Sequence, residues 1–138
     1  MTEGYAGDLD PQEAWEILAT TESAVLVDVR TDSEWRFVGV PDTSSLNKAA
    51  LLVQWNTAAG QNPDFLDELA VHGVTPGAGP VLFLCRSGAR SIDAARAATA
   101  AGIEPAYNIS EGFEGPLDDS GHRGGAGWKA TGLPWRQS

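Results

Sequence analysis

Cysteine, positive charge and long apolar runs are all scarce in this sequence, and each shortage argues against a class of protein. The 138 residues include 1 cysteine and 2 histidines. A lone cysteine cannot form a disulfide within the chain, so the fold depends on its core, and a reducing compartment fits this composition. Because the histidines lie far from the cysteine in the sequence, no metal site is predicted and no cofactor is implied.

Acidic residues outnumber basic ones by 19 to 9, which gives a formal net charge of -10. A field of that sign repels phosphate backbones and argues against nucleic acid as a partner. No segment approaches the roughly 20 apolar residues of a membrane span, so we expect no membrane partner. Because the acidic residues 1–10 also lack the apolar centre of a secretion signal, we expect a cytoplasmic protein.

The length fits one domain, which we predict to cover residues 1–138 with a core from about 8 to 136. Three apolar runs predict buried strands, and three segments with helical spacing and end signals predict helices. The strands are expected at 24–27, 81–84 and 106–109, and the helices at 11–20, 63–71 and 91–101. Strands that alternate with helices indicate a small α/β domain with a mainly parallel sheet.

The remaining stretches give weaker signals. Residues 31–38 are polar apart from two aromatic side chains, and we expect a loop with a short helical turn, broken by Val40-Pro41-Asp42. Residues 46–55 suit a short helix followed by an extended piece, and residues 112–127 make up a glycine-rich tail. No internal repeat and no long linker divides the chain.

The predicted strand at 81–84 leads directly into the single cysteine, Cys85. Open α/β sheets place ligands at the carboxyl ends of their strands, which is where this thiol falls. The backbone amides of a tight loop and the N-terminus of the following helix supply partial positive charge, which favours a thiolate and binds anions. Gly88 permits the positive φ that a cradle-shaped loop can require.

Four further side chains of this loop strengthen the case for a site. Arg86 and Arg90 add full positive charges, and Ser87 and Ser91 add hydroxyl donors. A cysteine that follows an apolar strand is often a small core residue. Two arginines and a glycine in the loop argue against that role here, because packing a core thiol requires none of them. The pattern favours a thiolate within a ring of donors, which suits attack on an anionic substrate and stabilises a charged persulfide.

The loop C-R-S-G-A-R, residues 85–90, resembles the active loop of the rhodanese superfamily. Three other stretches resemble motifs of that family in the right order. They are V-L-V-D-V-R-x-x-x-E-W at 25–35, Y-N-I-S-E-G-F-E-G at 107–115 and G-W-K-A-T-G-L-P-W at 127–135. The resemblance implies a rhodanese-like α/β fold, in which helices flank both faces of a five-stranded, mainly parallel sheet.

The same resemblance implies the two-step reaction of a thiosulfate sulfurtransferase. Cys85 would take sulfane sulfur from a small donor such as thiosulfate, and the persulfide would pass it to cyanide, a thiol or a protein acceptor. Arg86 and Arg90 would hold the anionic donor while backbone amides cradle the transferred sulfur. The substrate-binding residues implied in this way are Arg86, Ser87, Gly88, Ala89, Arg90 and Ser91.

Four residues that follow the first predicted strand are expected to support the site. Asp28 and Arg30 either orient the site or pair with arginines of the loop, or else they form a structural ion pair at the strand end. Glu34 is expected to hold the loop through a charge-assisted hydrogen bond or to lie apart from it. Trp35 either lines the mouth of the pocket or packs in the core.

One stretch departs from the family pattern. Most relatives carry G-H-I-x-G-A after the D-V-R motif, whereas residues 38–45 of this chain are V-G-V-P-D-T-S-S and lack the histidine. We expect this change to affect the shape of the pocket and the choice of acceptor more than the sulfur chemistry, which belongs to the loop.

Two other functions use similar parts. Cysteine phosphatases place five residues between cysteine and arginine, whereas four separate Cys85 from Arg90, a loop better sized for one sulfur than for a tetrahedral phosphate. The other alternative is a rhodanese-like module that binds or senses without turnover, but inactive relatives typically lose the cysteine that this sequence keeps. The physiological donor, the acceptor and the oligomeric state stay open.

Overall fold

A central sheet of five parallel strands organises the protein, in the spatial order β1-β8-β7-β2-β4. The structure is a computed structural model that describes residues 4–57, 60–115, 119–122 and 125–137. The strands of this sheet are β1 (Gly7–Leu9), β2 (Val25–Asp28), β4 (Leu51–Leu52), β7 (Val81–Leu84) and β8 (Ala106–Ile109). The expected five-stranded parallel sheet is confirmed, and β7, which leads into Cys85, is its central strand.

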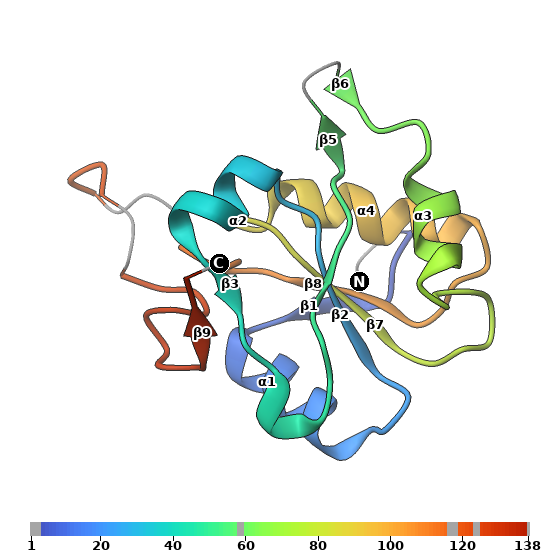
Figure 1. Cartoon of the computed structure of the whole chain (residues 1–138), viewed down its shortest axis with the longest axis horizontal. Coiled ribbons are helices and arrows are strands. Elements are labelled where there is room, and N and C mark those ends of the chain that lie inside the picture. The colour runs from blue at the N-terminus through green and yellow to red at the C-terminus, as the bar shows by residue number, and fades with distance from the viewer. Residues whose placement is uncertain (1–3, 58–59, 116–118, 123–124, 138) are drawn as a thin grey trace.

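Helices cover both sides of this sheet, as expected (Figure 1). The helix α1 lies on one side, and α2, α3 and α4 lie on the other. Their bounds are α1 (Pro11–Thr20), α2 (Asp32–Val38), α3 (Phe65–Val71) and α4 (Ala89–Ala100), with a 3-10 turn η1 (Ser44–Leu46). Each helix in the described part of the chain falls short of the length and apolar character needed to cross a membrane.

Two short antiparallel pairs lie outside the main sheet. The strand β3 (Val40–Pro41) pairs with β9 (Trp135–Arg136), and β5 (Asn56–Thr57) pairs with β6 (Gly60–Gln61). The helix α2 ends before Val40-Pro41-Asp42, where an interruption was expected. The same segment supplies β3, which pairs with the C-terminal strand β9. This pairing was not predicted, because each strand is only two residues long.

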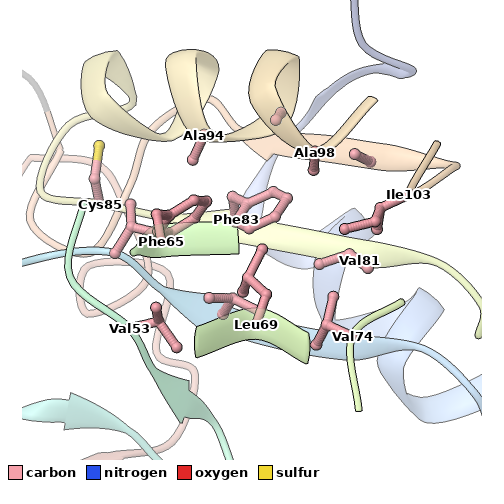
Figure 2. Packing of buried hydrophobic residues seen from close by; sticks show 14 residues of the cluster. Val53, Phe65, Leu69, Val74, Val81, Phe83, Cys85, Ala94, Ala98 and Ile103 are labelled. Carbon is pink, nitrogen blue, oxygen red and sulfur yellow. The ribbon is translucent and has the colours of Figure 1, made fainter. Parts of the chain in front are cut away.

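The core has two halves because side chains alternate between the faces of the central strands. On the side of α3 and α4, Val27 and Phe83 belong to the same buried cluster as Leu69 (Figure 2). On the side of α1, Leu82 belongs to a second cluster with Leu18. Since each large apolar side chain contributes roughly 1.5–3 kcal/mol when buried, these layers hold β7, and the residue that follows it, in a fixed position.

Two helices, α1 and α2, begin at capping boxes. In α1, Asp10 accepts from the Glu13 amide over 2.8 Å and Glu13 accepts from the Asp10 amide over 3.0 Å. The prediction of a loop with a short turn at 31–38 was wrong, because α2 is a seven-residue helix. A second capping box, in which the side chains of Thr31 and Glu34 accept from each other's amides, stabilises its first turn.

Other bounds differ from the predictions by one or two residues. The helix α3 begins two residues later than predicted, at Phe65, and α4 begins two residues earlier, at Ala89. Within 46–55 the extended piece is confirmed by β4, whereas the only helical turn near the expected short helix is η1, which shares Leu46 alone with this stretch. The edge strand β1 was not predicted because it is short and polar. Part of the glycine-rich tail at 112–127 lies outside the described residues.

Candidate functional site

Cys85 lies at the centre of the candidate site, between β7 and α4. The residue is 1% exposed, and its sulfur points toward the N-terminal end of α4 and away from the packed apolar side chains (Figure 2). The amide of Gly88 donates to Sγ over 3.1 Å, and Ser91 Oγ lies 3.2 Å from Sγ. The sulfur therefore lies where a backbone amide and a hydroxyl group converge.

The loop that surrounds the sulfur is shaped by the turn that follows β8. Gly88 has a φ of +104°, and a Cβ at this position would collide with the carbonyl oxygen of Ser110. Only glycine combines this φ with so close an approach at no steric cost. The amide of Phe113 donates to the carbonyl of Cys85 over 2.8 Å. The turn after β8 thus donates a hydrogen bond to the carbonyl of Cys85, while the amide of Gly88 donates to the sulfur.

Arg90 is held by Glu34 at the start of α2. Its Nη1 and Nη2 donate to Oε1 and Oε2 over 2.7 and 3.0 Å. Burial opposes ionisation of Glu34, but the hydrogen bonds from Arg90 and Thr31 outweigh it and lower the Glu34 pKa to about 2. The hydrogen bonds between Arg90 and Glu34 also raise the pKa of Arg90. The expectation that Glu34 holds the loop agrees with this geometry, in which Glu34 also compensates the charge of Arg90.

Arg86 is the more available of the two loop cations. It is exposed, and among the described residues no ion pair involves it. Sequence reasoning gave Arg86 and Arg90 the same task, whereas among the described ion pairs only that of Arg90 involves a loop arginine. Of the other loop residues, Ser87 is half-buried and Ala89 is exposed as the first residue of α4. An anion at the mouth of the loop would therefore meet the charge of Arg86, which no carboxylate in the described residues compensates.

Asp28 and Arg30 pair with each other and with neither loop arginine. Arg30 Nη2 donates to Asp28 Oδ2 over 2.7 Å, and Arg30 Nε donates to Oδ1 over 3.0 Å, with both side chains fully buried. The guanidinium also donates to the carbonyl of Gly39 over 2.7 Å and lies 4.2 Å from the centre of the Phe113 ring. The structure therefore favours the structural ion pair, which ties the end of β2 to the segment after α2 and to the turn beneath the loop.

Trp35 follows Glu34 on α2, and the altered stretch begins at the end of the same helix. Trp35 is half-buried on α2 and belongs to neither apolar cluster of the described residues. Within 38–45, the strand β3 is buried, and a cavity of about 240 Å³ lies beside Thr43 and Lys48. Cys85 does not line this cavity. The departure from the family pattern thus lies beside the ion pair of Arg30, whose guanidinium donates to the carbonyl of Gly39.

Sequence reasoning missed two polar residues near the sulfur. Ser91 Oγ donates to Asn108 Oδ1, and Asn108 Nδ2 donates to Asp8 Oδ1 over 2.9 Å. The sequence did contain a signal for Asn108. It shares one face of a predicted buried strand with Ala106, and a buried polar side chain needs a hydrogen-bond partner. Asp8 had no such signal, since the strand that carries it was not recognised.

Comparison with known proteins places the whole described domain in one family. Residues 7–138 match the family model described as STR4 middle domain. An uncharacterized protein of Rickettsia rickettsii is 38% identical over 126 residues, which cover 90% of this chain and 92% of that protein. Rhodanese-like domain-containing protein 4 of Arabidopsis thaliana is 29% identical over 124 residues, which cover 90% of this chain but 24% of the plant protein.

Solved structures of other proteins share the fold of this chain. The crystal structure of Rv0390 from M. tuberculosis shares 58% identity and a TM-score of 0.87, covering 97% of this chain and 99% of that one. The polysulfide-sulfur transferase homodimer from Wolinella succinogenes shares 26% identity and a TM-score of 0.64, covering 94% and 77%. A rhodanese-like domain protein from Staphylococcus aureus has the same fold, with a TM-score of 0.59 at 20% identity and coverage of 94% and 97%.

Proposed function

The chain belongs to the rhodanese-like family, and we propose that it is a sulfurtransferase that carries sulfane sulfur as a persulfide on Cys85. The donor is a small anion that carries sulfane sulfur, with thiosulfate and polysulfide as the two candidates. Polysulfide enters the proposal because the related Wolinella protein is described as a polysulfide-sulfur transferase. The acceptor is a nucleophile such as cyanide or a thiol, including a thiol on another protein.

The reaction has two displacements at sulfur. The Cys85 thiolate attacks the outer sulfur of thiosulfate, whose S–S bond breaks, and sulfite leaves with the bonding electron pair. Cys85 then carries a new S–S bond and a terminal sulfur with one negative charge. In the second step the acceptor attacks this terminal sulfur, and Cys85 leaves as the thiolate. Atoms and charge balance in both steps without any cofactor.

One observation carries this proposal, and it is the position of the sulfur at the start of α4. The Gly88 amide at 3.1 Å and the helix N-terminus offer partial positive charge to a terminal sulfur that lies beyond Sγ. Because Cys85 is almost fully buried, bulk water has little access to a persulfide formed there. The same burial favours a small or extended donor over a bulky one.

The two loop arginines should contribute differently to donor binding. Arg86 has no carboxylate partner among the described ion pairs, whereas Arg90 is already paired with Glu34. We expect Arg86→Ala to raise the KM for thiosulfate by about 10-fold, as the loss of a charged contact to the anion would. Steady-state kinetics with thiosulfate and cyanide check this. An unchanged KM would show that Arg86 does not contact the donor.

Persulfide formation is tested directly by mass spectrometry of the intact protein. After incubation with thiosulfate or polysulfide, the wild type should gain the mass of one sulfur atom, and cyanide or a thiol should remove it. Since the chain has 1 cysteine, Cys85→Ser is a complete control and should gain nothing. Failure of every sulfane donor to load the wild type would refute the proposal and favour a module that binds without turnover.

The phosphatase alternative is tested in the same preparation. We expect no turnover of an aryl phosphate, because the loop is one residue shorter than a phosphate cradle and Arg90 is paired with Glu34. Hydrolysis by the wild type that disappears in Cys85→Ser would overturn the assignment.

A further inference from the structure

A chain of side-chain hydrogen bonds runs from the sulfur of Cys85 to the outer edge of the sheet. Ser91 Oγ lies 3.2 Å from Sγ and donates to Asn108 Oδ1. Asn108 Nδ2 donates to Asp8 Oδ1 over 2.9 Å, and the Tyr5 hydroxyl donates to the same carboxylate oxygen over 2.9 Å. These hydrogen bonds join α4, β8 and β1, so residues about a hundred positions apart in the sequence belong to one network.

Strand register and burial hold this network in place. Asp8 of β1 is the direct partner of Asn108 on β8, so the two side chains lie on the same face of the sheet. Asn108 is 1% exposed and Ser91 is fully buried, whereas Asp8 at the edge of the sheet is exposed. Buried polar groups of this kind keep their hydrogen bonds, because water cannot replace a lost partner. The network therefore has one favoured arrangement.

Asp8 determines the direction of the hydrogen bonds in the network. A carboxylate can only accept, so Asn108 must turn its NH₂ group toward Asp8 and its Oδ1 toward Ser91. The Ser91 hydroxyl has a single proton and donates it to Asn108. Toward Cys85, Ser91 then offers a lone pair. A lone pair can accept from a neutral thiol, but it repels a thiolate or a persulfide.

We propose that Asp8 is a positioning residue that acts through Asn108 and Ser91 to disfavour negative charge on the sulfur of Cys85. For Ser91 to donate to a charged sulfur, its hydroxyl must rotate away from Asn108 and leave a buried carbonyl unpaired. The effect on the thiolate holds whatever reaction the site performs. The second consequence rests on the proposed function: a persulfide that lacks this hydrogen bond is less favoured relative to the neutral thiol, so the equilibrium for unloading onto an acceptor is more favourable.

The first test measures the thiolate of Cys85 by its ultraviolet absorbance as a function of pH, with Cys85→Ala as the blank. In Asp8→Ala, Asn108 can turn its NH₂ group to Ser91, whose hydroxyl then donates to the sulfur. We expect the ratio of thiolate to thiol at a given pH to rise about 5-fold, the effect of one hydrogen bond. Asp8→Asn retains an acceptor oxygen for Asn108 and should match the wild type.

Charge alone is a competing explanation, and a matched variant separates it. Arg90 interacts electrostatically with Cys85, Asp28 and Glu34, and all of these residues, together with Arg86, are kept in the variants. Glu16→Ala removes one exposed acid from α1 and should leave the ratio unchanged. Equal ratios in Asp8→Ala and wild type would overturn the proposal. An equal rise in Asp8→Ala and Asp8→Asn would also overturn it, because charge rather than direction would then be responsible.

The second test measures the persulfide. At a fixed ratio of thiosulfate to sulfite, the Asp8→Ala variant should hold about 5-fold more persulfide relative to thiol than the wild type, by intact mass. Equal loading of the two proteins would contradict the effect on unloading. If no variant takes up sulfur from any donor, the proposed function fails, while the absorbance measurement still decides whether Asp8 controls the sulfur.

Discussion

Two arginine–carboxylate pairs flank Cys85, and they differ in how far water reaches them. Asp28 and Arg30 are fully buried, whereas the side chains of Glu34 and Arg90 are 19% and 22% exposed. Both pairs are forked, with two nitrogens of the guanidinium donating to the carboxylate. The geometry of the two ion pairs is thus similar, and burial is the variable that separates them.

This difference in burial gives the two pairs different tasks. A buried ion pair gains little net stability, because desolvation offsets the attraction, but it cannot lose one partner without leaving an unpaired charge in the core. Arg30 also bonds to the carbonyl of Gly39 and stacks on Phe113, so the buried pair joins three segments beneath the loop. The half-exposed pair of Glu34 and Arg90 connects only α2 with α4, and it can change with less cost to the fold.

The largest effect is expected from breaking the buried pair. Asp28→Ala leaves the Arg30 guanidinium buried without its carboxylate, and we expect a loss of about 3–5 kcal/mol in the free energy of unfolding. Urea denaturation followed by tryptophan fluorescence measures it. A loss as small as that of a surface ion pair would mean that water reaches Arg30 and that the two pairs do not differ.

A double variant sharpens this result. Asp28→Ala combined with Arg30→Met removes both charges and keeps an apolar chain on Phe113, so we expect it to be more stable than Asp28→Ala alone. Comparing the unfolding free energies of the single and the double variant separates the cost of one unpaired buried charge from the net stability that the ion pair contributes. A double variant that is less stable than the single one would show that Arg30 stabilises the fold mainly through Gly39 and Phe113.

A smaller effect is expected from the half-exposed pair. Glu34→Gln keeps the shape and an acceptor oxygen but removes the charge, and we expect it to lower the free energy of unfolding by about 1 kcal/mol. Arg90 then regains an uncompensated charge near the sulfur, so the KM for thiosulfate should fall by about 3-fold. Parallel denaturation and kinetic measurements check both. A weaker fold with an unchanged KM would show that Arg90 only supports the loop.

The sequence predicted the centre of the molecule better than its edges, for a physical reason. The strand before Cys85 is a continuous apolar run, and the loop after it concentrates arginine, serine and glycine, so both signals are local. The helix over 32–38 was also within reach, because Thr31 and Glu34 have the spacing of a capping box. The two aromatic residues in that stretch, Trp35 and Phe37, hid the signal because residues two positions apart do not share a face of a helix.

Contacts between distant segments could not be predicted in this way. The bond between Asn108 and Asp8 requires β1 to pair with β8 in one register, and neither the pairing nor the strand β1 was visible in the sequence. The bond from Arg30 to Gly39 requires a turn after α2 whose shape depends on β3 and β9. Sequence reasoning therefore named the nucleophile and its loop, and it missed Asn108 and Asp8, which contact the site from β8 and β1.

The smallest expected effect is a difference in acid sensitivity between the wild type and Glu34→Gln. The pKa of Glu34 falls from 4.5 to about 2 in the folded protein. Because the folded protein binds this proton less readily than the unfolded chain, ionised Glu34 contributes stability above pH 4.5 that is lost as the pH falls toward 2. Other carboxylates titrate equally in both proteins, so the gap in unfolding free energy between wild type and variant should narrow across that window. A gap that stays constant would mean that Arg90 stabilises protonated and ionised Glu34 alike, and the half-exposed pair would then owe its strength to hydrogen bonding rather than to charge.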